Sequence, residues 1–74
     1  MDQKITYKLI RHIAILSERT NGWTKQLNLI AWGDKEPQYD IRDWSPDRSQ
    51  VGNGVTLNAA ELQSLSDALE DLEL

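Results

Sequence analysis

Residues 39–57 of the chain read YDIRDWSPDRSQVGNGVTL. The first six residues have the composition of a strand, and the SPD sequence at residues 45–47 ends it. Arg42 and Trp44 stand two residues apart, so an extended backbone places a cation and a large aromatic ring on the same side of a sheet. A nucleic acid base can stack on such a surface, and this pair is therefore our first candidate binding site.

Strand-like segments precede and follow this stretch. Residues 5–17 are rich in Ile, Thr and Tyr, which favours a long strand, although Ile5, Leu9, Ile13 and Leu16 would also suit an amphipathic helix. Further strands are predicted over residues 23–32, 38–44 and 55–57, with turns at residues 18–22 and 33–37 and a break at residues 45–54. The pattern predicts a sheet of four strands that follow one another in the chain.

The C-terminal segment predicts a helix. Asn58 with Glu61 three residues later forms a capping box, which starts the helix at about residue 59. Leucines then recur at spacings of three and four residues and form a narrow apolar seam. These are Leu62, Leu65, Leu69 and Leu72. The seam suits packing against the chain's own sheet or against a partner helix, and we expect it to form the interface of a homodimer.

Length and composition bound the remaining possibilities. The chain has 74 residues, which make one domain over residues 1–74, and so short a chain buries little surface unless it is stapled or paired. It has no cysteine and one histidine, so we expect neither disulfides nor a metal site, and no cofactor. The N-terminus lacks a signal pattern, and no apolar run approaches the ~18 residues of a membrane span. We therefore expect a cytoplasmic protein that does not bind membranes.

The acidic charge is concentrated in the helix. The formal net charge is −4, yet residues 59–74 hold five acids and no base, whereas residues 1–58 hold eight bases and seven acids. A sheet face away from the helix can therefore be locally basic, and the net charge does not exclude nucleic acid as a partner.

The side-chain alternation predicts the two faces of the sheet. If Ile30 pairs with Ile41 and Trp32 with Tyr39, the bulkiest apolar side chains align and these four residues share the buried face. The other face then carries the following residues: Trp23, Lys25, Leu27, Leu29, Asp40, Arg42 and Trp44. A slip of one residue would place Ile30 and Trp32 beside Arg42 instead. In either register Arg42 and Trp44 stay together.

Several motifs occur in a fixed order between residues 22 and 57. They are Gly22-Trp23 with Lys25, Leu27-Asn28, Trp32, Pro37, Tyr39-Asp40-Ile41-Arg42, Trp44-Ser45-Pro46-Asp47 and Gly52-x-Gly54-Val55-Thr56-Leu57. In this order they resemble the YdbC-type bacterial members of the positive cofactor four family, which are single-stranded DNA-binding transcriptional coactivators. The similarity extends over nearly the whole chain.

The resemblance implies an α+β fold and a mode of binding. It implies a four-stranded curved antiparallel sheet followed by one C-terminal helix, a homodimer built largely through the helices, and single strands bound along the concave faces. The family's arginine in the DIR motif falls on Arg42 and its following aromatic on Trp44. A lysine that is usual between the two glycines is Asn53 here, which removes one phosphate contact.

Binding of a single strand needs aromatic faces for the bases and cations for the phosphates. The expected nucleic-acid-binding residues are Trp23, Lys25, Asn28, Arg42, Trp44 and Arg48. Trp44 is as well suited to the core as to stacking, and Trp32 better suited to the core. From the residues alone, Arg42 between Asp40 and Asp43 is better suited to a surface ion pair than to a contact with nucleic acid.

The sequence does not indicate an enzyme. It has no nucleophile motif and no glycine-rich phosphate loop, because residues 52–54 precede a strand rather than follow one. We expect a protein that binds single-stranded DNA with little sequence preference and acts in transcription or in DNA replication and repair. The alternatives are an RNA-binding protein or a protein-protein interaction module, a transcription cofactor that works through its acidic helix.

Overall fold

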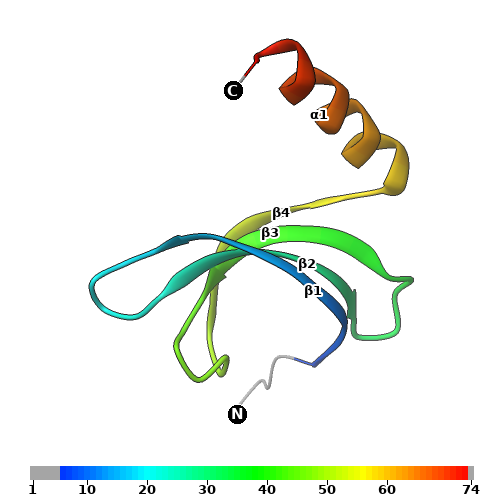
Figure 1. The fold of residues 1–74 in the computed structure, drawn as a ribbon. Coiled ribbons are helices and arrows are strands. Elements are labelled where there is room, and N and C mark those ends of the chain that lie inside the picture. The colour runs from blue at the N-terminus through cyan, green and yellow to red at the C-terminus, as the bar shows by residue number, and fades with distance from the viewer. Residues whose placement is uncertain (1–5, 74) are drawn as a thin grey trace.

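The computed structural model describes residues 6–73, which form a four-stranded antiparallel sheet followed by one helix (Figure 1). In chain order the elements are β1 (Tyr7–Glu18), β2 (Thr24–Trp32), β3 (Gln38–Trp44), β4 (Val51–Leu57) and α1 (Ala59–Asp71). The strands lie in the sheet in the order β1-β2-β3-β4, so every connection joins neighbouring strands. The predicted α+β fold is confirmed.

The first segment is a strand, and its irregular pairing explains why its sequence also suits a helix. The register of β1 against β2 shifts three times, between Leu9 and Arg11, between His12 and Ala14, and between Ile15 and Ser17. Each bulge inserts one extra residue, so the side-chain alternation is reset about every three residues and approaches the helical period. Bulges also bend the strand that carries them, and β1 follows the curvature of the sheet. Ile5, the first residue of the predicted apolar series, lies outside the described residues.

β4 begins four residues earlier than predicted because its glycines belong to the strand. Gly54 pairs with Arg42 of β3, and a Cβ on Gly54 would collide with the Arg42 Cβ and the Ile41 carbonyl oxygen. Only glycine fits so close to the neighbouring backbone. The sequence of residues 52–54 therefore marks a close approach between two strands beside Arg42, rather than a loop.

The register of β2 against β3 corrects the predicted one. Ile30 pairs with Gln38 rather than Ile41, and Leu29 pairs with Tyr39. This register differs from the predicted one by three residues. Because three is an odd number, the β2 residues expected on the same face as Arg42 lie on the opposite face, and the others take their place. The face that carries Arg42 and Trp44 also carries Thr24, Gln26, Asn28, Ile30 and Asp40. Trp32 contacts Arg42 on this face, as expected for a slip by an odd number of residues.

We call this surface the concave face, because the sheet curls around it. Alternate residues on it are buried, although no second layer of the chain covers them. Gln26, Asn28, Ile30, Asp40 and Trp44 are buried, and only the curling of the sheet around them can exclude solvent. Figure 1 shows the strands bent into an arch, with α1 outside it. The core is small: among the described residues, Ile30 and Trp44 are the buried hydrophobic ones.

We call the opposite surface the convex face. It carries Lys25, Leu27, Leu29, Tyr39, Ile41 and Asp43 of β2 and β3. Leu27, Leu29, Tyr39 and Ile41 are only half-buried. The convex face is therefore apolar in its centre, whereas the concave face buries polar groups.

The predicted capping box starts α1. The Asn58 side chain accepts a hydrogen bond from the Glu61 amide at 2.8 Å, and the Glu61 side chain accepts one from the Asn58 amide at 2.8 Å. None of the α1 residues is buried, and Leu65, Leu69 and Leu72 are 38%, 43% and 63% exposed. The leucine seam thus remains largely uncovered in the single chain. No helix within residues 6–73 is long and apolar enough to cross a membrane.

Candidate nucleic-acid interface

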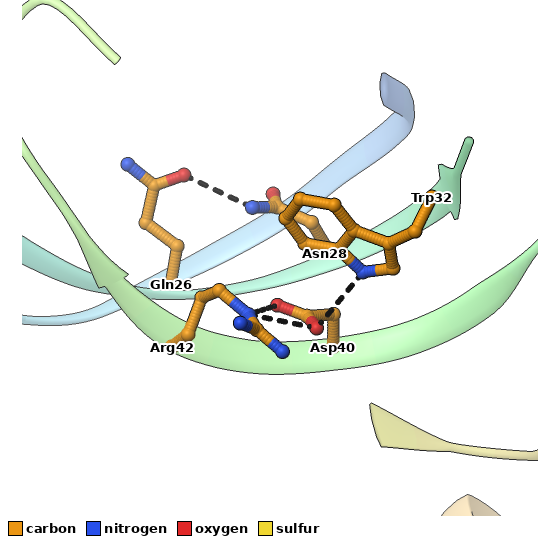
Figure 2. A network of polar contacts seen from close by, with 5 residues as sticks. All are labelled: Gln26, Asn28, Trp32, Asp40 and Arg42. Carbon is orange, nitrogen blue, oxygen red and sulfur yellow. Dashed lines mark hydrogen bonds and ion pairs between the residues drawn. The ribbon is translucent and has the colours of Figure 1, made fainter. Parts of the chain in front are cut away.

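Arg42 lies at the centre of the concave face and is held from two sides (Figure 2). Its Nε donates to both carboxylate oxygens of Asp40, at 2.8 and 2.9 Å, and its guanidinium carbon lies 4.8 Å from the centre of the Trp32 ring. The Trp32 Nε1 donates to the same carboxylate at 3.3 Å. Asp40 is completely buried, so Arg42 pairs with a carboxylate inside the sheet and not with a surface acid. The guanidinium is thus held to Asp40 through its Nε, and the hydrogen bonds found within residues 6–73 include none from its Nη groups to Asp40.

A chain of amide groups lies beside this ion pair. Asn28 donates to the Gln26 side chain at 3.1 Å, and Gln26 donates to the Thr24 hydroxyl at 2.8 Å. The Asn28 carbonyl oxygen lies 2.7 Å from the His12 Nδ1 of β1. Figure 2 shows the Asn28 and Gln26 amides on the same face as Arg42. His12 of β1 thus has a side-chain partner, and Asn28 ties β1 to β2 rather than standing free.

Three aromatic rings meet across the concave face, although Trp32 ends β2 and Trp44 pairs with Thr24 at the start of β2. Trp44 is 0% exposed, and its ring is stacked at 13° to the Trp32 ring with 6.1 Å between centres. Tyr7 packs against both, at 5.1 Å from Trp44 and 5.7 Å from Trp32. Trp44 therefore belongs to the core and offers no surface to a base in this conformation. Trp32 keeps part of its surface exposed.

Arg48 joins these three rings from the loop between β3 and β4. Its guanidinium carbon lies 6.0 Å from the centre of the Trp44 ring. Its backbone has a φ of 61°, the left-handed region that non-glycine residues rarely adopt, and its carbonyl accepts from the Tyr7 hydroxyl at 3.5 Å. No salt bridge to a carboxylate is found for Arg48 among the described residues, which makes it a candidate phosphate ligand.

Trp23 and Lys25 do not join this site. Lys25 pairs with Asp43 across β2 and β3, which places it on the convex face, opposite to Arg42. Trp23 precedes β2 and lines a pocket with the loop after β3. The prediction that both share a face with Arg42 and Trp44 is wrong, because the hairpin register differs from the predicted one by an odd number of residues.

Gln26 is the residue of this site that the sequence interpretation missed. Asp40 was expected on the face of Arg42 but not as a buried partner, and Trp32 was expected beside Arg42 only in the alternative register. The pairing of apolar residues across the hairpin was expected to set the register, yet buried polar side chains fill the inner face. The spacing of Asp40 and Arg42, two residues apart on a strand, is the signal that places a carboxylate beside the guanidinium. Within residues 6–73 no cluster of three His, Asp or Glu side chains suits a metal ion.

Comparison with other sequences places the chain beside one bacterial protein. No protein-family model matches the chain. A protein of Treponema pallidum (strain Nichols), described as an uncharacterized protein, is 44% identical over 68 residues, which span 92% of this chain and 80% of that protein. Identity at this level over most of both sequences indicates common descent and a common fold. The chain therefore belongs to the same family as this Treponema protein.

Proposed function

We propose that the protein binds single-stranded nucleic acid along the concave face, with DNA as the expected strand and with little sequence preference. The observation that carries this proposal is the Arg42 guanidinium, which is fixed by Asp40 at 2.8 Å and lies over the partly exposed Trp32 ring at 4.8 Å. A single strand exposes both phosphates and unstacked bases, and such strands bind where cations and aromatic rings lie side by side in a groove. The resemblance to the positive cofactor four family supports the same function.

Each group of the concave face has a part in this proposal. The Nη groups of Arg42 and the guanidinium of Arg48 contact phosphates. Trp32 stacks on a base, at about 1–3 kcal/mol per base. This role moves to Trp32 because the Trp44 ring is completely buried, packed against Tyr7 and Trp32. Asn28 and His12 supply polar groups along the strand's path, and because every base has a π-face, these contacts tolerate sequence.

We further propose that the protein acts as a homodimer whose interface includes the leucine seam of α1 and the convex face. Leu65, Leu69 and Leu72 are exposed in the single chain, and the half-buried apolar centre of the convex face has no covering layer. Burial of apolar surface contributes about 25 cal/mol per Å², so a second copy supplies the stability that this small core lacks. The acidic residues of α1 then stay at the rim and away from the bound strand.

The cellular process follows from the same proposal. A protein that holds unpaired strands without strong sequence preference fits transcription or DNA replication and repair. RNA is the second candidate ligand, because no residue of the concave face is arranged to distinguish a 2′-hydroxyl group. An acidic helix that binds another protein is the rival function, and it predicts no ligand on the concave face.

An NMR titration with oligo-dT separates these functions. We expect the Trp32 Nε1 proton and the Gln26 and Asn28 side-chain amides to shift on addition of the strand, while the backbone amides of Lys25 and Leu27 on the convex face move little. An equal titration with oligo-rU compares RNA with DNA. Shifts confined to α1 or the convex face would contradict the proposed surface, and no shift at all would contradict strand binding.

A further inference from the structure

A pocket of about 340 Å³ lies at the end of the sheet, outside the concave face. Its lining comes from the beginning of β2 and from the loop that joins β3 to β4. The lining residues are Trp23, Ser45, Pro46, Asp47, Ser49 and Gln50. The lining therefore combines an indole and a proline ring with polar residues, which we call the polar wall.

The pocket is preformed, because the turn and the loop that build it are held in place. Gly22 has a φ of +90°, and a Cβ on it would lie only 2.9 Å from the Pro46 Cγ, so the turn before Trp23 packs closely on the loop. Within the loop, the Ser45 amide donates to the Gln50 carbonyl at 3.0 Å, and the Gln50 amide donates to the Ser45 hydroxyl at 3.0 Å. Ligand pockets are usually formed before the ligand arrives, and this one meets that condition.

Asp47 gives the polar wall its chemistry. Its Oδ1 accepts from the Ser45 hydroxyl at 2.9 Å, the Ser49 amide at 3.0 Å and the Ser49 hydroxyl at 2.7 Å. These hydrogen bonds, first of all that of the Ser49 side chain, lower the pKa of Asp47 from 3.8 to about 2, so the group is a carboxylate at neutral pH. All three bonds end on Oδ1, and Oδ2 accepts none of the side-chain hydrogen bonds found within residues 6–73. The wall repels phosphate and favours a ligand that donates N–H groups.

We propose that this pocket binds one nucleobase that carries an exocyclic amino group, with the base stacked on Trp23 and the amino group donating to Asp47 Oδ2. Cytosine, adenine and guanine each carry such an amino group, whereas thymine carries carbonyl oxygens and no exocyclic amino group. An apolar ring wall and a single fixed acceptor suit a planar base better than a flexible chain.

The loop connects this pocket to the concave face, so the pocket deepens the proposed strand-binding function and rests on it. Arg48, in the same loop, lies over the Trp44 ring of the concave face, while its neighbours Asp47 and Ser49 line the pocket. A strand that leaves the concave face and contacts Arg48 through a phosphate reaches the pocket with its next base. The strand end that occupies the pocket then shows a base preference, although the rest of the strand does not.

The first arm of the test uses oligonucleotides of about 20 nucleotides, long enough to exceed usual site sizes. Three are compared by fluorescence anisotropy at fixed salt: all-dT, and dT with a single dC at the 5′ or the 3′ end. We expect one of the two dC-terminated strands to bind about five- to tenfold more tightly than all-dT, near the lower limit for a carboxylate that reads a base amine. Equal affinity of all three strands would overturn the preference.

Variants assign the preference to the pocket. Asp47→Asn keeps an oxygen that accepts from Ser45 and Ser49, so the loop stays intact, but the added amide donors no longer favour an amino group. It should bind all three strands equally, and Trp23→Ala should lose the preference as well. Glu36→Gln removes the same charge from the turn between β2 and β3 and should keep it. A preference that survives in Asp47→Asn would contradict the assignment.

The second arm uses free nucleosides and does not depend on strand binding. Cytidine and adenosine at millimolar concentration should shift the Trp23 Nε1 proton and the Ser49 and Gln50 amides, and thymidine should not. If all-dT fails to bind while cytidine still shifts these signals, the proposed function fails and the pocket stands as a nucleoside site. If all-dT binds while no nucleoside and no terminal dC has an effect, the pocket proposal fails and the proposed function stands.

Discussion

The charge of the concave face depends on one buried ion pair, and Asp40→Asn tests how that pair acts on a bound strand. Asp40 is fully buried, whereas the Arg42 side chain is 19% exposed, so the cation alone of the two reaches solvent. In the parent protein the two charges cancel. Asp40→Asn leaves a net positive charge at this position, Arg42→Ala leaves a net negative one, and the double variant is neutral again.

Salt dependence converts these charges into measurable slopes. Each neutralised phosphate of a single strand contributes about −0.7 to the slope of log affinity against log salt concentration. We expect Asp40→Asn to steepen the slope for oligo-dT by about 0.7 and Arg42→Ala to flatten it by about the same amount. The double variant should return to the parent slope. Anisotropy titrations at four KCl concentrations measure the series, with Lys25→Ala on the convex face as the control that leaves the slope unchanged.

The same variants both lower the stability of the fold, but by different amounts. Arg42→Ala leaves a buried carboxylate without its ionic partner, which costs about 3–5 kcal/mol. Asp40→Asn keeps an oxygen that accepts from Arg42, and the guanidinium is partly hydrated, so we expect a cost of about 1.5–3 kcal/mol, as for one hydrogen bond to a charged group. Urea unfolding gives both values, and the double variant should be more stable than Arg42→Ala. Equal slopes in all four proteins, with the fold intact, would refute a phosphate contact at Arg42.

Three further predictions concern the dimer, the aromatic cluster and the loop. Leu65→Asp or Leu69→Asp should dissociate and largely unfold the protein, because each places a carboxylate in the proposed interface; light scattering that shows a monomer for the parent at micromolar concentration would contradict the dimer. Trp32→Ala should weaken oligo-dT binding by about 1–3 kcal/mol, measured by anisotropy, with circular dichroism to show that the fold is intact. Trp44→Ala should mainly lower the free energy of unfolding, by about 3–5 kcal/mol. The lowered pKa of Asp47 stabilises the folded state above the ordinary value of 3.8, and this contribution should be lost as the pH falls toward about 2. The free energy of unfolding of the parent and of Asp47→Asn is compared from neutral pH down to about pH 2. A difference between the two that stays constant over this range would contradict the prediction.

Local signals predicted the elements of the fold well. The capping box of Asn58 and Glu61 starts the helix at the predicted residue, and the bounds of β3 agree with the prediction. Both depend on contacts between residues close in sequence, which a single sequence displays. The one large difference in bounds is the earlier start of β4. It arises because the two glycines within residues 52–54 pack closely against the neighbouring strand β3.

The register and the site could not be predicted in the same way. Matching Ile30 with Ile41 assumes that the inner face is apolar, but Gln26, Asn28 and Asp40 are buried there. Asn28 donates to Gln26, and Asp40 accepts hydrogen bonds from Arg42 and Trp32. Polar residues in an alternating strand are typical of a solvent-facing side, so the pattern indicated the opposite face. Arg42 and Trp44 share a face as predicted, because their spacing along β3 does not depend on the register. The contact of Trp32 with Arg42 depends on the register, and the role of Asp40 depends on its burial in the curled sheet.

The central claim is that the concave face holds unpaired bases, and competition between single and double strands tests it most directly. A duplex keeps its bases stacked internally and offers mainly phosphates. The cancelled charges of Asp40 and Arg42 attract phosphates weakly, and the acidic helix repels them. A labelled single strand of about 20 nucleotides is bound at fixed salt and challenged with unlabelled single strand or with the matching duplex. We expect the single strand to displace the label at concentrations far below those at which the duplex has any effect. Displacement by duplex at the same concentration as by single strand would contradict the account and favour an acidic-helix interaction protein.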